Sequence, residues 1–267
     1  MKLGSKLLLQ TVLPAVLAVS LLLVIVTLVA SKALQESAER GLAAVAEARR
    51  EDLRNHLERM RDDIVSMGNA PAVIAAMQQF SAAFAACGAR ADSQLQPLYD
   101  SDVPHTANSA NSASHPCRHG YQQAHGEHDV FFRRRHAVYG WQDMLLVDLQ
   151  GHVVYSLLKD HDFATNLFTG PWKDSGLARV ATIALRQAVS GVPAFADAEP
   201  YAAAGNRPAM FLAIPIREPE TGQPLGALVA QIAFAPLDRH MHFKAGLGES
   251  GEAFLVGSGG WLLTNTF

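Results

Sequence analysis

The chain has 267 residues, of which 49% are hydrophobic and 18% are charged, and its formal net charge at pH 7 is −3. This length allows one large domain or two small ones. Because the net charge is slightly negative, the chain offers no basic field to nucleic acid, and we expect no nucleic-acid partner.

The N-terminal segment contains a stretch that is long and apolar enough to cross a membrane. Residues 7–30, LLLQTVLPAVLAVSLLLVIVTLVA, hold no charged side chain over 24 positions. At about 1.5 Å per residue, this length covers a hydrocarbon core of about 30 Å. The alternative is a cleaved signal peptide, with a weak cleavage site at 31–33, but the apolar core of such a peptide is only about 7–15 residues long. We predict a transmembrane helix within residues 1–31.

The charges that flank this stretch predict its orientation. Lys2 and Lys6 precede it, whereas basic and acidic residues alternate just after it. Positive charge collects on the cytoplasmic side of membrane proteins. We therefore expect the N-terminus in the cytoplasm and residues 31–267 outside it.

Two cysteines, Cys87 and Cys117, lie in the part that we expect to be exported. An oxidising compartment permits them to pair, and closing such a loop would stabilise the fold by about 3 kcal/mol. The sequence leaves open whether they pair or stay as two free thiols.

Residues 32–99 have the pattern of two helices. Residues 32–68 carry apolar side chains at steps of three and four, and no proline interrupts them before Pro71: Leu34, Ala38, Leu42, Val45, Leu53, Leu57, Met60, Ile64 and Met67. Such a helix either packs on its own domain or pairs with a second subunit as a stalk. We expect both, with the lower part pairing in a homodimer and the upper part packing on the domain. Residues 70–99 form a second, alanine-rich helical run.

Residues 100–137 are predicted to form a polar, His-rich loop or insertion. Their first part, DSDVPHTANSANSASHPCRHG, is dominated by Ser, Asn, Ala and Pro without a period. Possible metal ligands gather within the 14 residues 115–128: His115, Cys117, His119, His125 and His128. Their spacing matches none of the usual zinc patterns, and Gly120 and Gly126 argue against a helix that would align them. We therefore favour a solvated loop over a metal site, and we expect no metal and no cofactor.

Residues 138–245 change to a pattern of strands around one helix, followed by a connection and a final hairpin over 246–267. Strands are predicted over 144–148, 153–158, 209–216, 225–234, 253–257 and 261–264, with a turn at Gly151 and a helix over 177–189. This order predicts an α+β domain with an antiparallel sheet of about five strands and helices on one side.

Catalytic patterns are weak. Asp160 and Asp162 lie two residues apart, and paired carboxylates can perform acid–base chemistry. At the end of a hairpin, however, we expect hydrated or capping residues. The segment Gly248–Gly251, with Ser250, does not match the nucleophile elbow, and the Walker A phosphate-loop pattern does not occur.

A binding pocket has more support. Aromatic residues gather around the predicted hairpins, together with a few varied polar residues: Trp141, Tyr155, Phe163, Trp172, Phe195, Tyr201 and Phe211, with Asp143, Lys159, Asp162, Asp197 and Arg207. Small-molecule sites are mostly apolar with a few convergent polar groups. The alternative is that these aromatic side chains are ordinary core.

Four stretches of the sequence from residue 139 onward resemble a known family. YGWQDMLLVDLQGHVVYSLLKDHDFATNLFTGPWKDSGLA at 139–178 is similar to the extracytoplasmic sensor region of bacterial methyl-accepting chemotaxis proteins, which carry Cache-type, PAS-like domains. FADAEPYAAAGNRPAMFLAIPI at 195–216, LGALVAQ at 225–231 and GLGESGEAFLVG at 246–257 resemble the parts that follow. The resemblance covers roughly 128–267. Lys159-Asp160 and Ala164 depart from the family's usual Lys-Glu and Gly.

The resemblance implies a receptor that binds a small molecule and relays the event across the bacterial inner membrane. It implies binding without turnover, with Asp197 and Tyr201 as polar contacts and Tyr155, Trp172 and Phe211 as walls. Such receptors continue into a second span, a HAMP linker and a signalling domain, so we expect Phe267 to fall within a longer protein. The output is expected to be chemotaxis, and the alternatives are a histidine kinase or a nucleotide cyclase. A membrane-anchored metal-dependent hydrolase is a further alternative.

Overall fold

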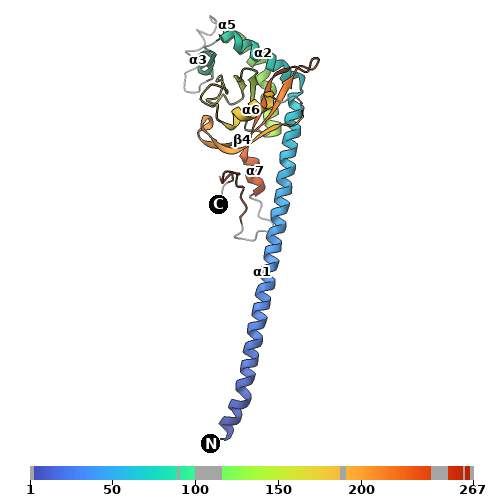
Figure 1. Ribbon diagram of the computed structural model, residues 1–267, viewed down its shortest axis with the longest axis vertical. Coiled ribbons are helices and arrows are strands. Elements are labelled where there is room, and N and C mark those ends of the chain that lie inside the picture. The colour runs from blue at the N-terminus through green and yellow to red at the C-terminus, as the bar shows by residue number, and fades with distance from the viewer. Residues whose placement is uncertain are drawn as a thin grey trace. The chain divides into compact units, whose positions relative to one another are not determined.

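The computed structural model describes residues 3–88, 91–99, 116–186, 191–241, 252–260 and 262–264. Helix α1 (Leu3–Gly68) begins in one compact unit and ends in a second, which starts at Leu53. Figure 1 shows α1 as one uninterrupted helix. The predicted helices over 1–31 and 32–68 are therefore a single element of secondary structure.

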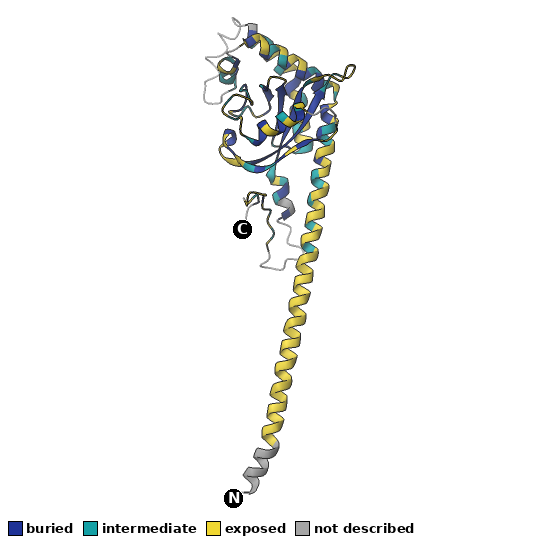
Figure 2. Cartoon of the chain, viewed as in Figure 1, coloured by how far each residue is buried: buried dark blue, intermediate teal, exposed yellow. Residues whose placement is uncertain are grey.

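The first part of α1 has the properties of a membrane span. Its most apolar stretch has a mean hydropathy of 2.9, and none of that stretch is buried within the protein. Figure 2 shows the described side chains of this part, from Val12 onward, as exposed. Exposed leucine and valine side chains over five helical turns are stable in lipid but not in water.

The last part of α1 packs in the core of the second unit, as predicted. Met60, Ile64 and Met67 are buried there. Gly68 lies so close to strand β4 (Arg207–Arg217) that a Cβ atom would come within 2.7 Å of the Ile214 side chain. The pairing of the lower part with a second subunit stays a prediction.

The second unit is built on one five-stranded antiparallel sheet, which confirms the predicted fold class. The strands are β1 (Asp143–Asp148), β2 (Val153–Ser156), β3 (Ala194–Tyr201), β4 (Arg207–Arg217) and β5 (Pro224–Ile232), in the order β2-β1-β5-β4-β3. β1 is buried along its whole length, as expected for a strand with both faces covered.

One strand differs from the prediction. The fifth strand is β3, whereas the predicted strands over 253–257 and 261–264 appear, in their described residues, as a single bridge between Val256 and Leu262. β3 contains Asp197 and Pro200, which weaken its strand signal. A proline is tolerated at this position because β3 lies at the edge of the sheet.

Helices cover both faces of the sheet, whereas the pattern predicted one. The end of α1, α2 (Pro71–Cys87) and α5 (Pro116–Tyr139) share a core with one face, and α6 (Gly176–Arg186) shares a second core with the other. We call these the α5 face and the α6 face. The short elements are α3 (Ala91–Leu95), η2 (Gln96–Leu98), η3 (Ala202–Ala204) and α7 (Phe234–Met241).

Helix α5 corrects the predicted loop over 100–137, of which residues 100–115 lie outside the described part. Gly120 and Gly126 each cost a helix about 1 kcal/mol. Burial of Tyr121, Ala124 and Phe132 on one side of α5 offsets this cost. A disulfide joins Cys87 at the end of α2 to Cys117 at the start of α5, with 4.8 Å between the Cα atoms. The open question about the cysteines is therefore answered in favour of pairing.

Candidate ligand-binding site

One end of the sheet brings together polar residues that are far apart in the sequence. In an antiparallel sheet, the start of one strand lies beside the end of the next. The starts of β1 and β4 therefore meet the ends of β2, β3 and β5. The segment 157–163 that follows β2 lies at this same end, which we call the polar end of the sheet.

Asp143, the first residue of β1, fixes the chain as it leaves β2. One of its carboxylate oxygens accepts hydrogen bonds from the amides of Met144, Leu157 and Leu158 at 2.6, 2.9 and 3.1 Å. The other accepts from the Ser156 hydroxyl at 2.8 Å. Burial raises the pKa of Asp143 to about 6, although these hydrogen bonds favour the charged form. Both carboxylate oxygens of Asp143 are therefore engaged in holding the chain segment that follows β2.

Lys159 is folded back over aromatic rings on the α5 face. Its backbone has a φ of 59°, which is uncommon for a residue with a side chain. Its ammonium lies 4.0, 4.8 and 5.1 Å from the ring centres of Tyr155, Phe163 and Tyr99. It donates a hydrogen bond to the Ser156 carbonyl. Burial lowers the pKa of Lys159 to about 7, because the rings replace water around the charge.

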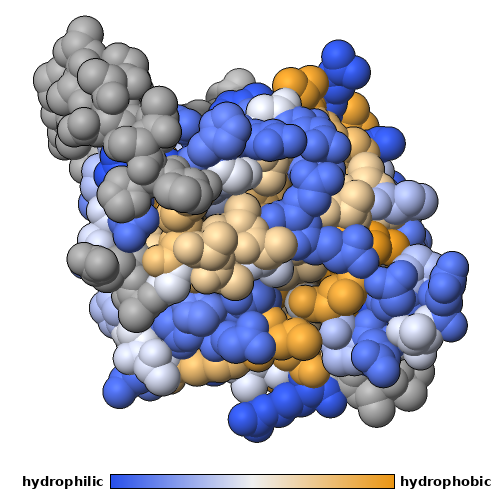
Figure 3. Space-filling model, turned by 90° about the horizontal axis from the view of Figure 1, so that it is seen from above, coloured by the Kyte–Doolittle hydropathy of each residue, from blue (hydrophilic) through white to orange (hydrophobic). Residues whose placement is uncertain are grey.

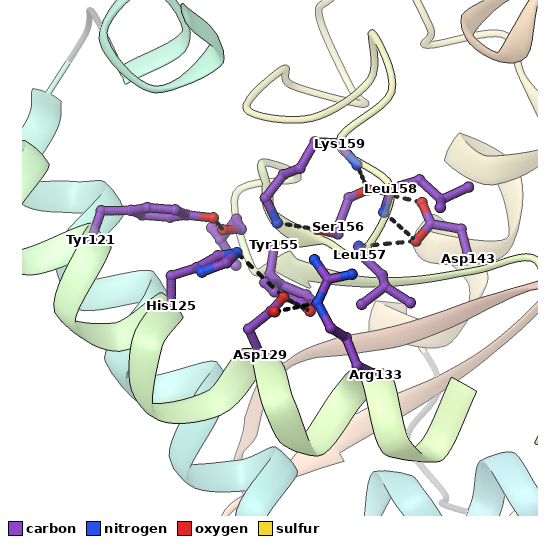
Figure 4. A network of polar contacts seen from close by, with 11 residues as sticks. Tyr121, His125, Asp129, Arg133, Asp143, Tyr155, Ser156, Leu157, Leu158 and Lys159 are labelled. Atoms are coloured by element: carbon purple, nitrogen blue, oxygen red, sulfur yellow. Dashed lines mark hydrogen bonds and ion pairs between the residues drawn. The ribbon is translucent and has the colours of Figure 1, made fainter. Parts of the chain in front are cut away.

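Helix α5 supplies a second set of charges near Lys159 (Figure 4). Asp129 accepts hydrogen bonds from the Tyr155 hydroxyl at 2.9 Å and from Arg133 Nε at 2.5 Å, and His125 lies 3.3 Å from its carboxylate. Burial alone would raise the pKa of Asp129, but the bond from Arg133 and the charge of His125 lower it overall. Burial and the nearby Lys159 charge lower the pKa of His125 to about 4. This set is internally paired.

Asp162 is a buried polar group at this end that is only partly satisfied. The Tyr201 hydroxyl donates to its Oδ2 at 2.5 Å, whereas its Oδ1 is buried and has no partner in the structure as described. Burial and the negative charge of Asp143 raise the pKa of Asp162 to about 7. An unmet buried oxygen costs about 1–3 kcal/mol, so its hydrogen-bonding capacity is open to another group.

A cavity of 330 Å³ opens at the polar end of the sheet. Its lining combines five charged or amide side chains with five apolar ones: Gln142, Asp160, Arg207, Gln231 and Asp238, with Pro208, Ile232, Phe234, Ala235 and Leu263. The volume is typical of a site for a small molecule.

Several polar groups in this lining have no protein partner among the described residues. The side-chain amides of Gln142 and Gln231 make no hydrogen bond with another described residue, although Gln231 is buried. The Nε of Arg207 donates to the Ala204 carbonyl at 3.1 Å, which orients the guanidinium and leaves its terminal nitrogens open. The Asp160 carboxylate is likewise open. Burial raises the pKa of Asp160, against the charge of Arg207.

The predicted contact residues are distributed over both faces of the sheet. Trp172, Tyr201 and Phe211 lie together on the α6 face, with the Tyr201 ring centre 6.4 Å from Trp172 and 5.1 Å from Phe211. Tyr155 lies on the α5 face. Asp197 accepts a hydrogen bond from the Ser258 amide at 3.0 Å. None of the five lines the cavity, and their contact with a ligand stays a prediction.

The structure also places the remaining candidates of the sequence. Asp162 is buried, so it is not the hydrated residue that its position after a hairpin predicted. Asp160 lines the cavity. His125 and His128 lie on α5, Cys117 is in the disulfide, and His115 and Ser250 lie outside the described residues. The described residues contain no group of three His, Cys, Asp or Glu side chains placed to hold a metal ion.

The chain matches no family model, and it matches no curated protein. Among solved structures, it is similar to the ligand-binding domain of the Pseudomonas fluorescens chemoreceptor CtaA in complex with L-serine, at 17% identity, over 81% of this chain and 73% of that one, with a TM-score of 0.35. It is also similar to the ligand-binding domain of the Campylobacter jejuni chemoreceptor Tlp3 in complex with 4-methylisoleucine, at 11% identity, over 79% and 69%, with a TM-score of 0.37.

A third solved structure is the sensor domain of the V. cholerae histidine kinase DctB, at 13% identity, over 64% of this chain and 58% of that one, with a TM-score of 0.31. All three are sensor or ligand-binding domains. With TM-scores below 0.5, these likenesses decide neither the ligand nor the site of this chain.

Proposed function

We propose that this chain is the extracytoplasmic ligand-sensing part of a transmembrane chemoreceptor. The observation that carries the proposal is the cavity at the polar end of the sheet, in which the side-chain amides of Gln142 and Gln231 and the Asp160 carboxylate have no protein partner among the described residues. It belongs to the unit in whose core α1 ends, and α1 begins with an apolar stretch of membrane-spanning length. The sequence resemblance to chemoreceptor sensor regions supports the same function. The N-terminus lies in the cytoplasm in this proposal.

The chemistry of the polar end favours binding over turnover. Asp143 and Asp129 are fully engaged in hydrogen bonds that hold the protein itself. The groups open to the cavity are amides, a carboxylate and a guanidinium. Such groups orient a ligand, and they include no nucleophile activated by a neighbouring base.

The ligand that this lining fits best is a small zwitterion. Asp160 and Arg207 carry opposite charges and line one cavity, and the charge of Arg207 acts to lower the pKa of Asp160, which burial raises. They nevertheless make no ion pair within 4 Å of each other in the described structure, so a ligand can bridge them. A guanidinium binds a carboxylate through two parallel hydrogen bonds, and a carboxylate accepts from an ammonium group. Phe234, Ile232 and Leu263 then face the ligand's apolar part.

The position of the end of α1 suggests how ligand binding could be relayed to the membrane. Its last turns are buried against the sheet, and Gly68 contacts β4, the strand that begins with Arg207 at the cavity. A ligand shifts the balance between two arrangements of the unit only by its differential affinity for them. In our proposal α1 carries this shift to the membrane, and its lower part pairs in a homodimer. The same sensor would serve a histidine kinase or a nucleotide cyclase equally well.

Thermal unfolding of the full chain in detergent micelles tests this function. A ligand that binds only the folded state stabilises it by about 2.7 kcal/mol at a concentration of 100 times its Kd. We expect at least one small zwitterion from a panel of amino acids and betaines to raise the Tm with concentration, and the Asp160→Asn variant to lose the shift. A panel of zwitterions, amines and carboxylates without any effect would contradict the proposal.

A further inference from the structure

The second unit leaves several large apolar side chains exposed, among them Val130, Leu149, Leu158, Phe168, Ile183 and Phe195. Figure 3 shows apolar patches of this kind within a mostly hydrophilic face. Single exposed apolar residues are ordinary. Leu149 and Phe168 differ from the rest because both line one hollow of 440 Å³.

This hollow lies at the opposite end of the sheet from the polar end. It is formed by the turn between β1 and β2, the segment 167–173 and the end of α6, which is labelled in Figure 1. Seven described residues line it: Leu149, Leu167, Phe168, Lys173, Thr182, Leu185 and Arg186. Leu167 is fully buried and forms an apolar floor that is continuous with the core of the α6 face.

The Phe168 wall is held in place by its neighbours. Gly151 has a φ of 86°, and a Cβ atom there would come within 2.5 Å of the Phe168 ring. The ring therefore lies directly over the glycine. The Asn166 side chain accepts hydrogen bonds from the amides of Phe168 and Thr169 at 2.8 and 3.0 Å and donates to the Gln150 carbonyl at 2.9 Å. An exposed aromatic ring is thus fixed before any ligand arrives, which lowers the entropy cost of binding.

The charges of the hollow have a single sign. Lys173 and Arg186 are its only charged lining residues among those described, and neither side chain forms a hydrogen bond or ion pair with another described residue. Two cations beside an apolar floor attract an anion that also carries an apolar body. The Thr182 hydroxyl adds a donor on the same side of α6.

We propose that this hollow binds an amphipathic organic anion, a carboxylate attached to an aromatic ring or a short hydrocarbon chain. The carboxylate pairs with Lys173 and Arg186, and the apolar body lies against Leu149, Leu167 and Phe168. The site is separate from the zwitterion cavity and does not depend on it, because the two lie at opposite ends of the sheet.

Calorimetric titration of the full chain in detergent micelles tests the proposal, with phenylacetate as the probe and neutral phenylacetamide as its matched control. We expect phenylacetate to bind, and each of Lys173→Gln and Arg186→Gln to weaken it by about tenfold, as for a lost charged hydrogen bond. Phenylacetamide should bind about tenfold more weakly than phenylacetate. Gly151→Ala, which displaces Phe168, should weaken both compounds.

Two variants serve as controls. Arg134→Gln removes an exposed arginine on α5, and Asp160→Asn alters the zwitterion cavity; both should leave phenylacetate binding unchanged. The proposal is overturned if phenylacetate does not bind, if phenylacetamide binds equally well, or if both charge variants bind phenylacetate like the wild type. An unchanged Tm in Lys173→Gln and Arg186→Gln would show that these variants are folded, so that their weaker binding of phenylacetate is not caused by unfolding.

Discussion

The Tyr201 hydroxyl donates a 2.5 Å hydrogen bond to one oxygen of the buried Asp162 carboxyl group, while the other oxygen has no partner within the described structure. Tyr201 ends β3, and Asp162 lies in the segment after β2, so the bond links the two edges of the sheet. A carboxyl group held in this way responds to pH.

Asp162→Asn should raise the free energy of unfolding at pH 8 more than at pH 5. The pKa of Asp162 is about 7 in the folded protein and 3.8 in a model compound. The folded protein therefore holds the proton more tightly, and its stability falls as pH rises from about 4 to 7. Asparagine still accepts from Tyr201 but carries no charge. Urea unfolding at the two pH values checks this, with the exposed Glu220→Gln as control. An equal effect at both would contradict it.

Lys159→Met should stabilise the protein, and more at pH 6 than at pH 9.5. Burial among three rings lowers the pKa of Lys159 to about 7 from 10.5. The cost of burying the charged form is complete below pH 7 and disappears as pH rises toward the unfolded pKa. Methionine keeps the apolar stem without the charge. Thermal unfolding at both pH values measures the difference, and a loss of stability at pH 6 would show that the cation–aromatic contacts outweigh the desolvation cost.

Asp143→Ala should destabilise the protein by about 3 kcal/mol or more. The substitution leaves the Leu158 amide and the buried Ser156 hydroxyl without this acceptor, whereas the Leu157 amide keeps its bond to the Met144 carbonyl. Asp143→Asn keeps an acceptor oxygen and should cost less. Chemical unfolding of the two variants checks this order, and an alanine variant as stable as wild type would refute the structural role.

Reduction of the Cys87–Cys117 disulfide should lower the Tm of the wild type and leave a Cys87→Ser, Cys117→Ser double variant unaffected. The bridge closes a loop with a sequence separation of 30 residues, which is worth about 3 kcal/mol by the loss of unfolded-chain entropy. Thermal unfolding with and without a reductant measures the effect. An identical response of the two proteins to reductant would contradict the bridge.

The sequence allowed the class of the fold to be predicted, because hydrophobic patterns are local. The apolar run before residue 31 and the strands around Gly151 have clear periods. The pattern does not predict β3, because Asp197 and Pro200 interrupt the alternation of apolar and polar residues that is typical of a strand. It does not predict α5, because Gly120 and Gly126 weaken the helix signal although one side of this helix is buried. In both cases tertiary packing outweighs the local preference.

The candidate site was predictable only in part. Asp143, Lys159, Asp162 and Arg207 stood out as polar residues among aromatic ones. The register of the sheet decides which of these residues form hydrogen bonds within the protein and which stay open. This register pairs Asp143 of β1 with Gln231 of β5. No local pattern gives that pairing, so the open amides of Gln142 and Gln231 had no signal in the sequence.

The measurement that tests the central claim most directly is a titration of the full chain with a stabilising zwitterion and with its analogue lacking the carboxylate, for the wild type and Arg207→Gln. If Arg207 holds the ligand's carboxylate, the wild type should bind the zwitterion about tenfold or more tightly than the analogue, and the variant should bind the two alike. The Asp160→Asn variant should instead bind the zwitterion and an analogue that lacks the ammonium group alike, whereas the wild type should prefer the zwitterion. Equal discrimination by the wild type and both variants would show that the cavity at the polar end of the sheet is not the sensing site.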